Sequence, residues 1–111
     1  MKYQRAHILI VDDVPEIEVR RIIDSYNQVR SWAFVHHSRH INGEIVKPHF
    51  HIYVELICSV DVLALASVFN VHPSQIQPVI SKASLIKYLV SQSSLYDIQA
   101  SFNVATAIGH K

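Results

Sequence analysis

Apolar and polar residues alternate along the chain in blocks that predict both strands and helices. Apolar, β-branched runs that end at turn residues are typical of strands. Four such runs lie at 7–13, 31–37, 48–57 and 74–80. Apolar residues at helical spacing predict three helices. These helices begin near Pro15 and then cover 62–69 and 82–94, and the tail from Tyr96 onward predicts a weak helix or strand.

Turn and cap residues define how these elements connect. Asn42-Gly43 lies in a polar loop and predicts that the second and third strands form an antiparallel hairpin. Ser59 is the expected N-cap of the helix at 62–69, which is apolar nearly all round and should be well buried. Pro78 restricts the fourth strand to a sheet edge or to the end of a strand, because it has no N–H to donate.

The predicted order, β-α-β-β-α-β-α, begins with the split βαβ pattern of a ferredoxin-like fold. We therefore expect an α+β fold. A length of 111 residues suits one domain, spanning 1–111. In such a fold the helices cover one face of an antiparallel sheet, and the other face is open for a ligand.

Composition limits the cellular locations and the classes of partner that are expected for the protein. Half of the residues are hydrophobic, but no run approaches the roughly 18 apolar residues of a membrane span. Acidic residues directly follow the first apolar run, which argues against a signal peptide. The single cysteine, Cys58, is expected to be an inert buried thiol, and a cytoplasmic location is expected. A net charge of +1 argues neither for nor against nucleic-acid binding.

Histidines are concentrated in one part of the sequence. Five of the eight lie within sixteen positions: His36, His37, His40, His49 and His51. Side chains alternate across a strand, so His49 and His51 should share one face while Phe50 and Ile52 point into the core. By the same parity His37 belongs on the histidine face, and His40 follows in the loop. Three or four imidazoles could thus bind one metal, although a polar open face would also accept histidines that bind none.

Tyr88 is the second candidate for chemistry. On the helix at 82–94, an apolar arc contains Leu85, Ile86, Leu89 and Val90. Tyr88 falls on the opposite arc among serines, whereas a tyrosine placed only for packing should share the leucine side. It is therefore either a partly exposed surface residue or a functional phenol.

These pieces together resemble a known family. The segments "FVHHSRH" and "KPHFHIYVEL" look like the metal-binding motifs of rolling-circle plasmid replication initiators, which are His-hydrophobic-His (HUH) endonucleases. In that family, His-x-x-Asp precedes Lys-x-His-hydrophobic-His, and a later helix carries a nucleophilic tyrosine. The counterparts here are "HSRH" (37–40), "KPHFH" (47–51) and "KYLVSQ" (87–92), and the resemblance covers roughly residues 5–96.

The resemblance implies a reaction on DNA. His37, His49 and His51 would bind Mn²⁺ or Mg²⁺, which would polarise the scissile phosphate of single-stranded or origin-hairpin DNA. Tyr88 would attack the phosphorus and leave a 5′-phosphotyrosine link and a free 3′-hydroxyl that primes replication. A host polymerase and helicase would be partners, and an oligomer is possible.

The sequence also departs from the family pattern. His40 stands where the family has Asp, so it is either a fourth ligand or turned away, and Ser91 stands where relatives often have His. Tyr53 and Tyr96 are competing nucleophiles, and Glu55 on the histidine face is a possible ligand or base. Four cations near the proposed site could hold DNA phosphates. They are Arg39, Lys47, Lys82 and Lys87.

Other functions are compatible with the same sequence. Conjugative relaxases and single-tyrosine transposases share the two-histidine motif. A non-catalytic DNA-binding or metal-binding ferredoxin-like module would need no nucleophile. The segment "LASVFNVHPSQIQPVI" (65–80) also looks like a helix-turn-helix, although Pro78 would fall inside its second helix and disrupt it.

Overall fold

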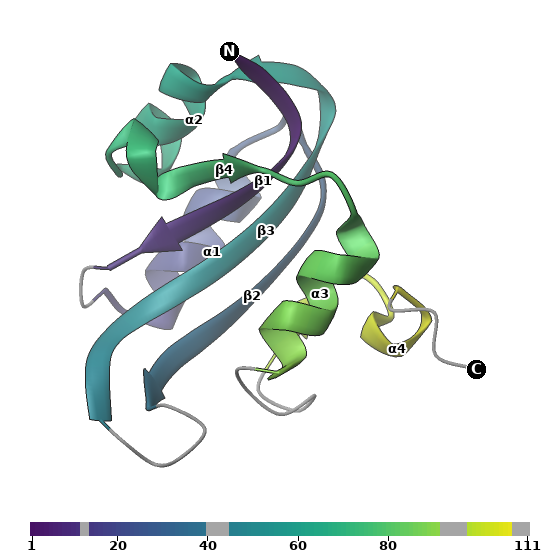
Figure 1. Cartoon of the computed structure of the whole chain (residues 1–111). Helices are drawn as coiled ribbons and strands as arrows, with labels where there is room; N and C mark the ends of the chain where they lie inside the picture. Colours follow the sequence, from purple (N-terminus) through teal and green to yellow (C-terminus); the bar gives the residue numbers. More distant parts are fainter. Residues whose placement is uncertain (12–13, 40–44, 92–97, 108–111) are drawn as a thin grey trace.

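The computed structural model describes residues 1–11, 14–39, 45–91 and 98–107 (Figure 1). Within these ranges, only the backbone is described for 37–39 and 45–48. The predicted loop at Asn42-Gly43 and the candidate residues His40 and Tyr96 therefore lie outside the described residues.

The described elements follow one another as strands and helices of very different length. The strands are β1 (Lys2–Ile10), β2 (Val29–Arg39), β3 (Ile45–Asp61), β4 (Ile76–Pro78) and β5 (Ile98–Ala100). The helices are α1 (Glu16–Ser25), α2 (Val62–Phe69), α3 (Lys82–Ser91) and α4 (Val104–Ala107), with a 3₁₀ turn, η1 (Pro73–Gln75), before β4.

All five strands form one antiparallel sheet in the order β4-β1-β3-β2-β5. The long strands β1, β3 and β2 occupy its centre, and the short strands β4 and β5 are its edges. This confirms the predicted α+β class with an antiparallel sheet, and the predicted hairpin pairing of β2 with β3. Pro78 is the last residue of the edge strand β4, as its missing N–H requires.

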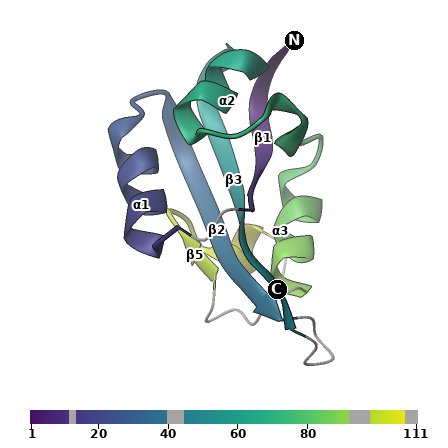
Figure 2. The ribbon, with the colours of Figure 1, turned by 90° about the vertical axis from the view of Figure 1, so that its left-hand side faces the viewer.

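Helices lie on both faces of the sheet, so the expectation of one open face is wrong. On one face, α1 and α2 cover a core that includes Ile8, Phe34 and Ile52. On the other face, Ile86 and Leu89 of α3 pack in a second core with residues of β2, β3 and β5. Figure 2 shows α1 and α3 on opposite sides of the sheet. The apolar stripe of α3 must be buried, and this face of the sheet provides apolar residues to bury it.

The start of α2 differs from the expectation. β3 continues through Ser59 to Asp61, and Asp61 is the N-cap, whose Oδ1 accepts a hydrogen bond from the backbone N–H of Leu63 at 2.9 Å. Carboxylates cap helices as well as hydroxyls do, so both residues were chemically suitable. The helix is also less buried than its apolar sequence suggested, because Leu63 is 66% exposed.

Two further expectations are corrected. Residues 73–78 form η1 and β4, so no second helix of a helix-turn-helix exists there. Cys58 is exposed rather than buried, and its thiol lies 3.5 Å from Oε1 of Gln28.

Replacing the N-cap should measurably weaken the fold. We expect Asp61→Ala to lower the free energy of unfolding by about 1 kcal/mol, because the N–H of Leu63 loses its acceptor. Ser59→Ala is the matched control and should change stability by less than about 0.5 kcal/mol. Urea unfolding followed by circular dichroism measures both, and equal losses would contradict the assignment of the cap.

Candidate functional site

His49 and His51 lie together on the side of β3 that faces α3. Their ring centroids are 4.9 Å apart and the rings are nearly perpendicular. His51 is buried, with 8% of its surface exposed, whereas His49 is partly exposed. The alternate residues Phe50 and Ile52 are in the core beneath α1 and α2, as strand parity predicted. The two imidazoles therefore project from one strand into one shared space.

The neighbouring strand brings a third predicted histidine into register. The backbone of His37 pairs with that of His49, and Val35 pairs with His51. The predicted placement of His37 beside the two strand histidines is thus supported at the level of the backbone. The side chain of His37 and the whole of His40 lie outside the described residues.

His7 of β1 also belongs to this site, and the sequence analysis did not identify it. Its Nε2 lies 2.9 Å from Nδ1 of His51, within hydrogen-bonding distance, and the two rings are nearly parallel with centroids 5.1 Å apart. Burial lowers the pKa of His7, so the ring is neutral at neutral pH. The alternation of side chains along a strand would have indicated His7, because Ile8 and Ile10 point into the core and His7 must therefore lie on the opposite face.

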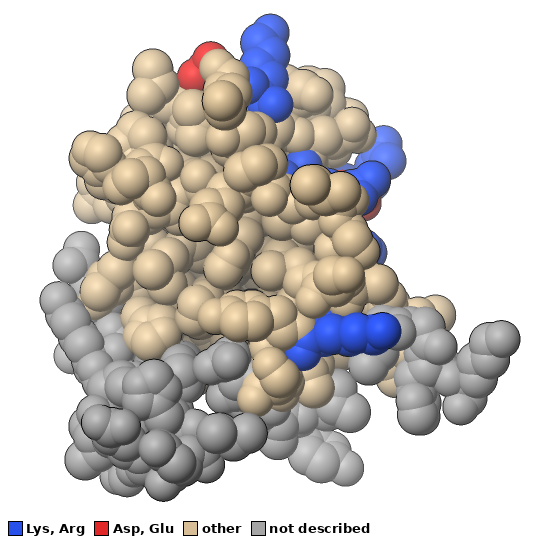
Figure 3. All heavy atoms as spheres, viewed as in Figure 1, with Lys and Arg blue, Asp and Glu red and all other residues tan. Residues whose placement is uncertain are grey.

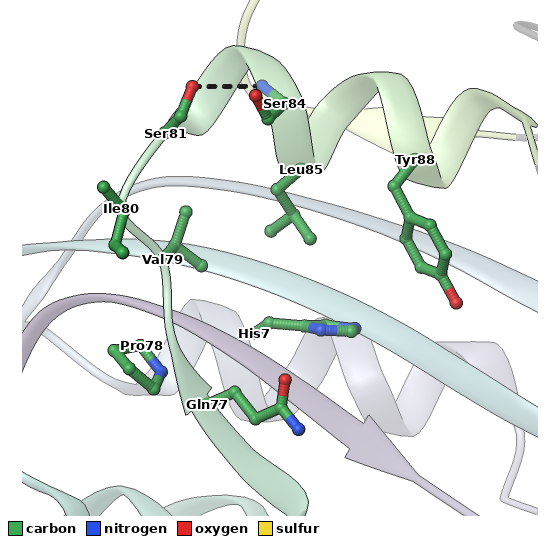
Figure 4. A pocket seen from close by; sticks show the side chains of 9 residues that line it. All are labelled: His7, Gln77, Pro78, Val79, Ile80, Ser81, Ser84, Leu85 and Tyr88. Atoms are coloured by element: carbon green, nitrogen blue, oxygen red, sulfur yellow. Dashed lines mark hydrogen bonds between the residues drawn. The ribbon is translucent and has the colours of Figure 1, made fainter.

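Tyr88 comes to the same place from α3. Its ring centroid lies 5.7 Å from that of His51 and 6.2 Å from that of His7, both in edge-on contacts. The side chain is 44% exposed. Ile86 and Leu89 pack the helix against the sheet. Tyr88 projects from α3 on the side of the cavity where His7 lies (Figure 4). Ser91 donates a hydrogen bond to the backbone carbonyl of Tyr88 at 2.7 Å.

A cavity of about 440 Å³ opens beside Tyr88 and His7 (Figure 4). Its walls come from β4, the connection that follows it and the first two turns of α3. They consist of apolar side chains and neutral polar ones, and none of the lining residues is Asp, Glu, Lys or Arg. The lining residues are His7, Gln77, Pro78, Val79, Ile80, Ser81, Ser84, Leu85 and Tyr88.

Tyr53 is poorly suited to be the nucleophile. It is fully buried, and its ring meets Phe102 edge-on at 6.2 Å. Burial, reinforced by the negative charge of Glu55, raises the pKa of Tyr53 to about 12. Glu55 is itself engaged, since its carboxylate lies 3.7 Å from Arg5 Nε and 3.4 Å from the hydroxyl of Ser31. Its burial and its raised pKa therefore argue against Tyr53 as the nucleophile.

Of the four predicted phosphate contacts, Lys82 and Lys87 have side chains that the structure describes. The ammonium of Lys82 lies 3.9 Å from the ring centre of Phe102 and 5.9 Å from that of Tyr53, so it packs on aromatic rings. Lys87 is exposed, and the side chains of Arg39 and Lys47 lie outside the described residues. Figure 3 shows that Lys and Arg are scattered over the face of the molecule seen in Figure 1, where acidic side chains are sparse.

The donors at this site fit a divalent cation in chemical type. Among the side chains that the structure describes, no group of three His, Cys, Asp or Glu is arranged to hold a metal ion. His49 and His51 supply two imidazoles, which suit such a cation when neutral. The other two predicted ligands, His37 and His40, have side chains outside the described part of the chain.

Comparison with known proteins adds no family assignment. No protein-family model matches the chain, and comparison with curated proteins finds no match.

None of the helices in the described ranges is long and apolar enough to cross a membrane.

The buried phenol of Tyr53 should give stability a specific alkaline dependence. Its folded-state pKa of about 12 exceeds the ordinary value near 10, so folding favours the neutral phenol. This contribution is complete below about pH 10 and is lost as the pH rises from 10 toward 12. Tyr53→Phe should therefore reduce the fall in unfolding free energy over that range. The Tyr53 hydroxyl makes no hydrogen bond within the described residues, so the substitution should cost less than about 1 kcal/mol at neutral pH.

Urea unfolding at several alkaline pH values measures this dependence, with Tyr3→Phe as the matched control at a partly exposed strand position. Identical pH dependence in wild type and Tyr53→Phe would show that the phenol does not titrate as its burial requires.

Proposed function

We propose that this chain is a metal-dependent, single-stranded DNA nicking and joining domain of the HUH type, acting in the initiation of rolling-circle replication. The observation that carries the proposal is the contact of Tyr88 with His51, at a ring-centroid distance of 5.7 Å. A helix and a strand far apart in sequence thus place an accessible phenol beside a cluster of imidazoles. A nucleophile next to imidazoles that can bind a cation suits metal-assisted phosphoryl transfer to tyrosine.

The arrangement of the sheet supports a ferredoxin-like core for this domain. The chain order from β1 to β4 is β-α-β-β-α-β, and these four strands lie in the order β4-β1-β3-β2. This order supports a split βαβ connectivity, in which the crossovers would place β1 and β3 side by side. β5 extends the sheet beyond β2, and α3 follows the core and carries Tyr88 to its second face.

Each residue has a defined part in the proposed reaction. His49 and His51, completed by His37 and His40, would hold Mn²⁺ or Mg²⁺, and the cation would supply charge stabilisation at the scissile phosphate. Tyr88 would attack the phosphorus as its phenol loses a proton. The new bond joins Tyr88 Oη to phosphorus, and the bond that breaks releases the 3′-oxygen of the preceding nucleotide, which takes up a proton as the hydroxyl. The phosphotyrosine bond conserves the energy needed to rejoin the strand.

The cavity beside Tyr88 suits the nucleotide next to the scissile phosphate. A wall without charged side chains favours a neutral base over a phosphate, and apolar surface from Val79 and Leu85 can pack against it. The amide of Gln77 and the hydroxyls of Ser81 and Ser84 line the same cavity and could bond to the edge of a base. The phosphate itself would lie nearer the histidines.

The nicking activity is tested by covalent capture of DNA. Wild-type protein with Mn²⁺ and single-stranded oligonucleotides that tile its own replicon should give a protein–DNA band on a denaturing gel. Tyr88→Phe should abolish the band because the variant lacks the attacking oxygen. The double variant His49→Ala/His51→Ala should abolish it as well, and so should EDTA. Tyr53→Phe, which leaves the site intact, should retain it.

A band that persists in Tyr88→Phe would assign the nucleophile elsewhere. Complete absence of a band in wild type, from protein shown to be folded and to bind both Mn²⁺ and DNA, would contradict nicking. That result would favour a non-catalytic DNA-binding or metal-binding module. A relaxase or single-tyrosine transposase would give the same band, but on conjugative-transfer or insertion-sequence DNA rather than at a replication origin.

A further inference from the structure

We infer that His7 is a positioning residue that fixes the tautomer of His51, so that His51 presents Nε2 to the cation. The inference rests on the proposed function, because that function makes His51 a metal ligand. It starts from the 2.9 Å separation of His7 Nε2 and His51 Nδ1. Two ring nitrogens this close share one proton, since one must donate and the other accept.

The direction of this hydrogen bond decides which nitrogen of His51 can bind a metal. A neutral imidazole carries one proton and has one lone pair in the ring plane. If Nδ1 of His51 donates to His7, the lone pair is on Nε2. If Nδ1 accepts from His7, the proton is on Nε2 and coordination through that atom is excluded. Metal binding by His51 through Nε2 therefore requires His7 to be the acceptor.

The fold holds His7 where it can perform this task. In the β1–β3 ladder, His7 lies opposite Tyr53 and is therefore the diagonal neighbour of His51, within reach of a ring. On its other side, β1 pairs with β4, where His7 lies opposite Gln77. Strands on both sides thus fix the backbone of His7. Its ring is nearly parallel to that of His51, at an interplanar angle of 22°, and meets Tyr88 edge-on.

A second partner that orients a metal-binding histidine is a common device in metal sites, where it commonly contributes 10- to 100-fold in metal affinity. The usual partner is a carboxylate, a carbonyl or water. Here a neutral imidazole would take that place, and it would add no negative charge beside the attacked phosphate. The contact of His7 with Tyr88 also couples the orientation of His51 to the position of the nucleophile.

The tautomer can be read directly in protein that contains neither metal nor DNA. Histidine-labelled protein at about pH 8 should give ¹⁵N resonances for His51 that identify Nδ1–H. His7→Phe keeps an aromatic ring but removes the acceptor, so the Nδ1–H signal of His51 should weaken. His7→Gln restores an acceptor oxygen and should recover part of the wild-type signal.

Metal affinity provides a second readout without catalysis. Mn²⁺ binding followed by electron paramagnetic resonance should weaken by roughly 10- to 100-fold in His7→Phe and by less in His7→Gln. Lys2→Gln, at an exposed position on β1, is the control for unrelated surface changes. Addition of Zn²⁺ that shifts the His51 Nε2 resonance and leaves the His7 resonances in place would agree with a positioning role.

Three results would overturn the inference. The first is an Nε2–H tautomer of His51 in the wild type. The second is unchanged Mn²⁺ affinity across the His7 variants. The third is a direct shift of His7 Nε2 on adding Zn²⁺, which would make His7 a ligand instead. A failed DNA-capture experiment would contradict nicking but would leave the assignment of the tautomer standing, so the two claims fail separately.

Discussion

The packing of α3 against the sheet is the constraint on which the candidate site depends. Ile86 and Leu89 are fully buried, and they share a core with Ala33, Val35 and Tyr53. Burial of two such side chains contributes several kcal/mol, about 1.5–3 kcal/mol each. This contact fixes the rotation of the helix, and rotation determines where Tyr88 projects. If α3 turned by one residue, about 100°, the phenol would leave the histidines and face either the sheet or solvent.

The same face of the sheet divides into two regions with different chemistry. Around Tyr53 it is dry, and the aromatic and aliphatic side chains there keep the Tyr53 phenol neutral. Around His7 and His51 this face is polar, and a cavity lined by His7 and Tyr88 lies beside it. The dry region supplies rigidity, and the polar region supplies the groups that can act on a substrate. A reactive residue held by its helix neighbours rather than by its own burial can stay both accessible and well placed.

Sequence alone was sufficient where one local rule applied. Strand parity placed His49 and His51 on one face and Phe50 and Ile52 on the other, and Pro78 correctly indicated an edge strand. It was insufficient where the answer depended on contacts between distant segments. Nothing local distinguishes Ser59 from Asp61 as a cap, and nothing in α3 reveals which face of the sheet it covers. His7 was missed for a related reason: its role arises from a neighbouring strand 44 residues away in sequence.

Identification of the residue that becomes linked to DNA tests the central claim most directly. After covalent capture, nuclease trimming and trypsin digestion, the linked nucleotide should be found on the peptide spanning 88–111, and fragmentation should place it on Tyr88 rather than Tyr96. Trypsin cleaves after Lys87, and it leaves Tyr53 on a different peptide, 40–82, because Lys47 precedes a proline. A nucleotide on Tyr88 would establish that α3 delivers the nucleophile to the histidine site. A nucleotide on Tyr53 or Tyr96 would contradict the account.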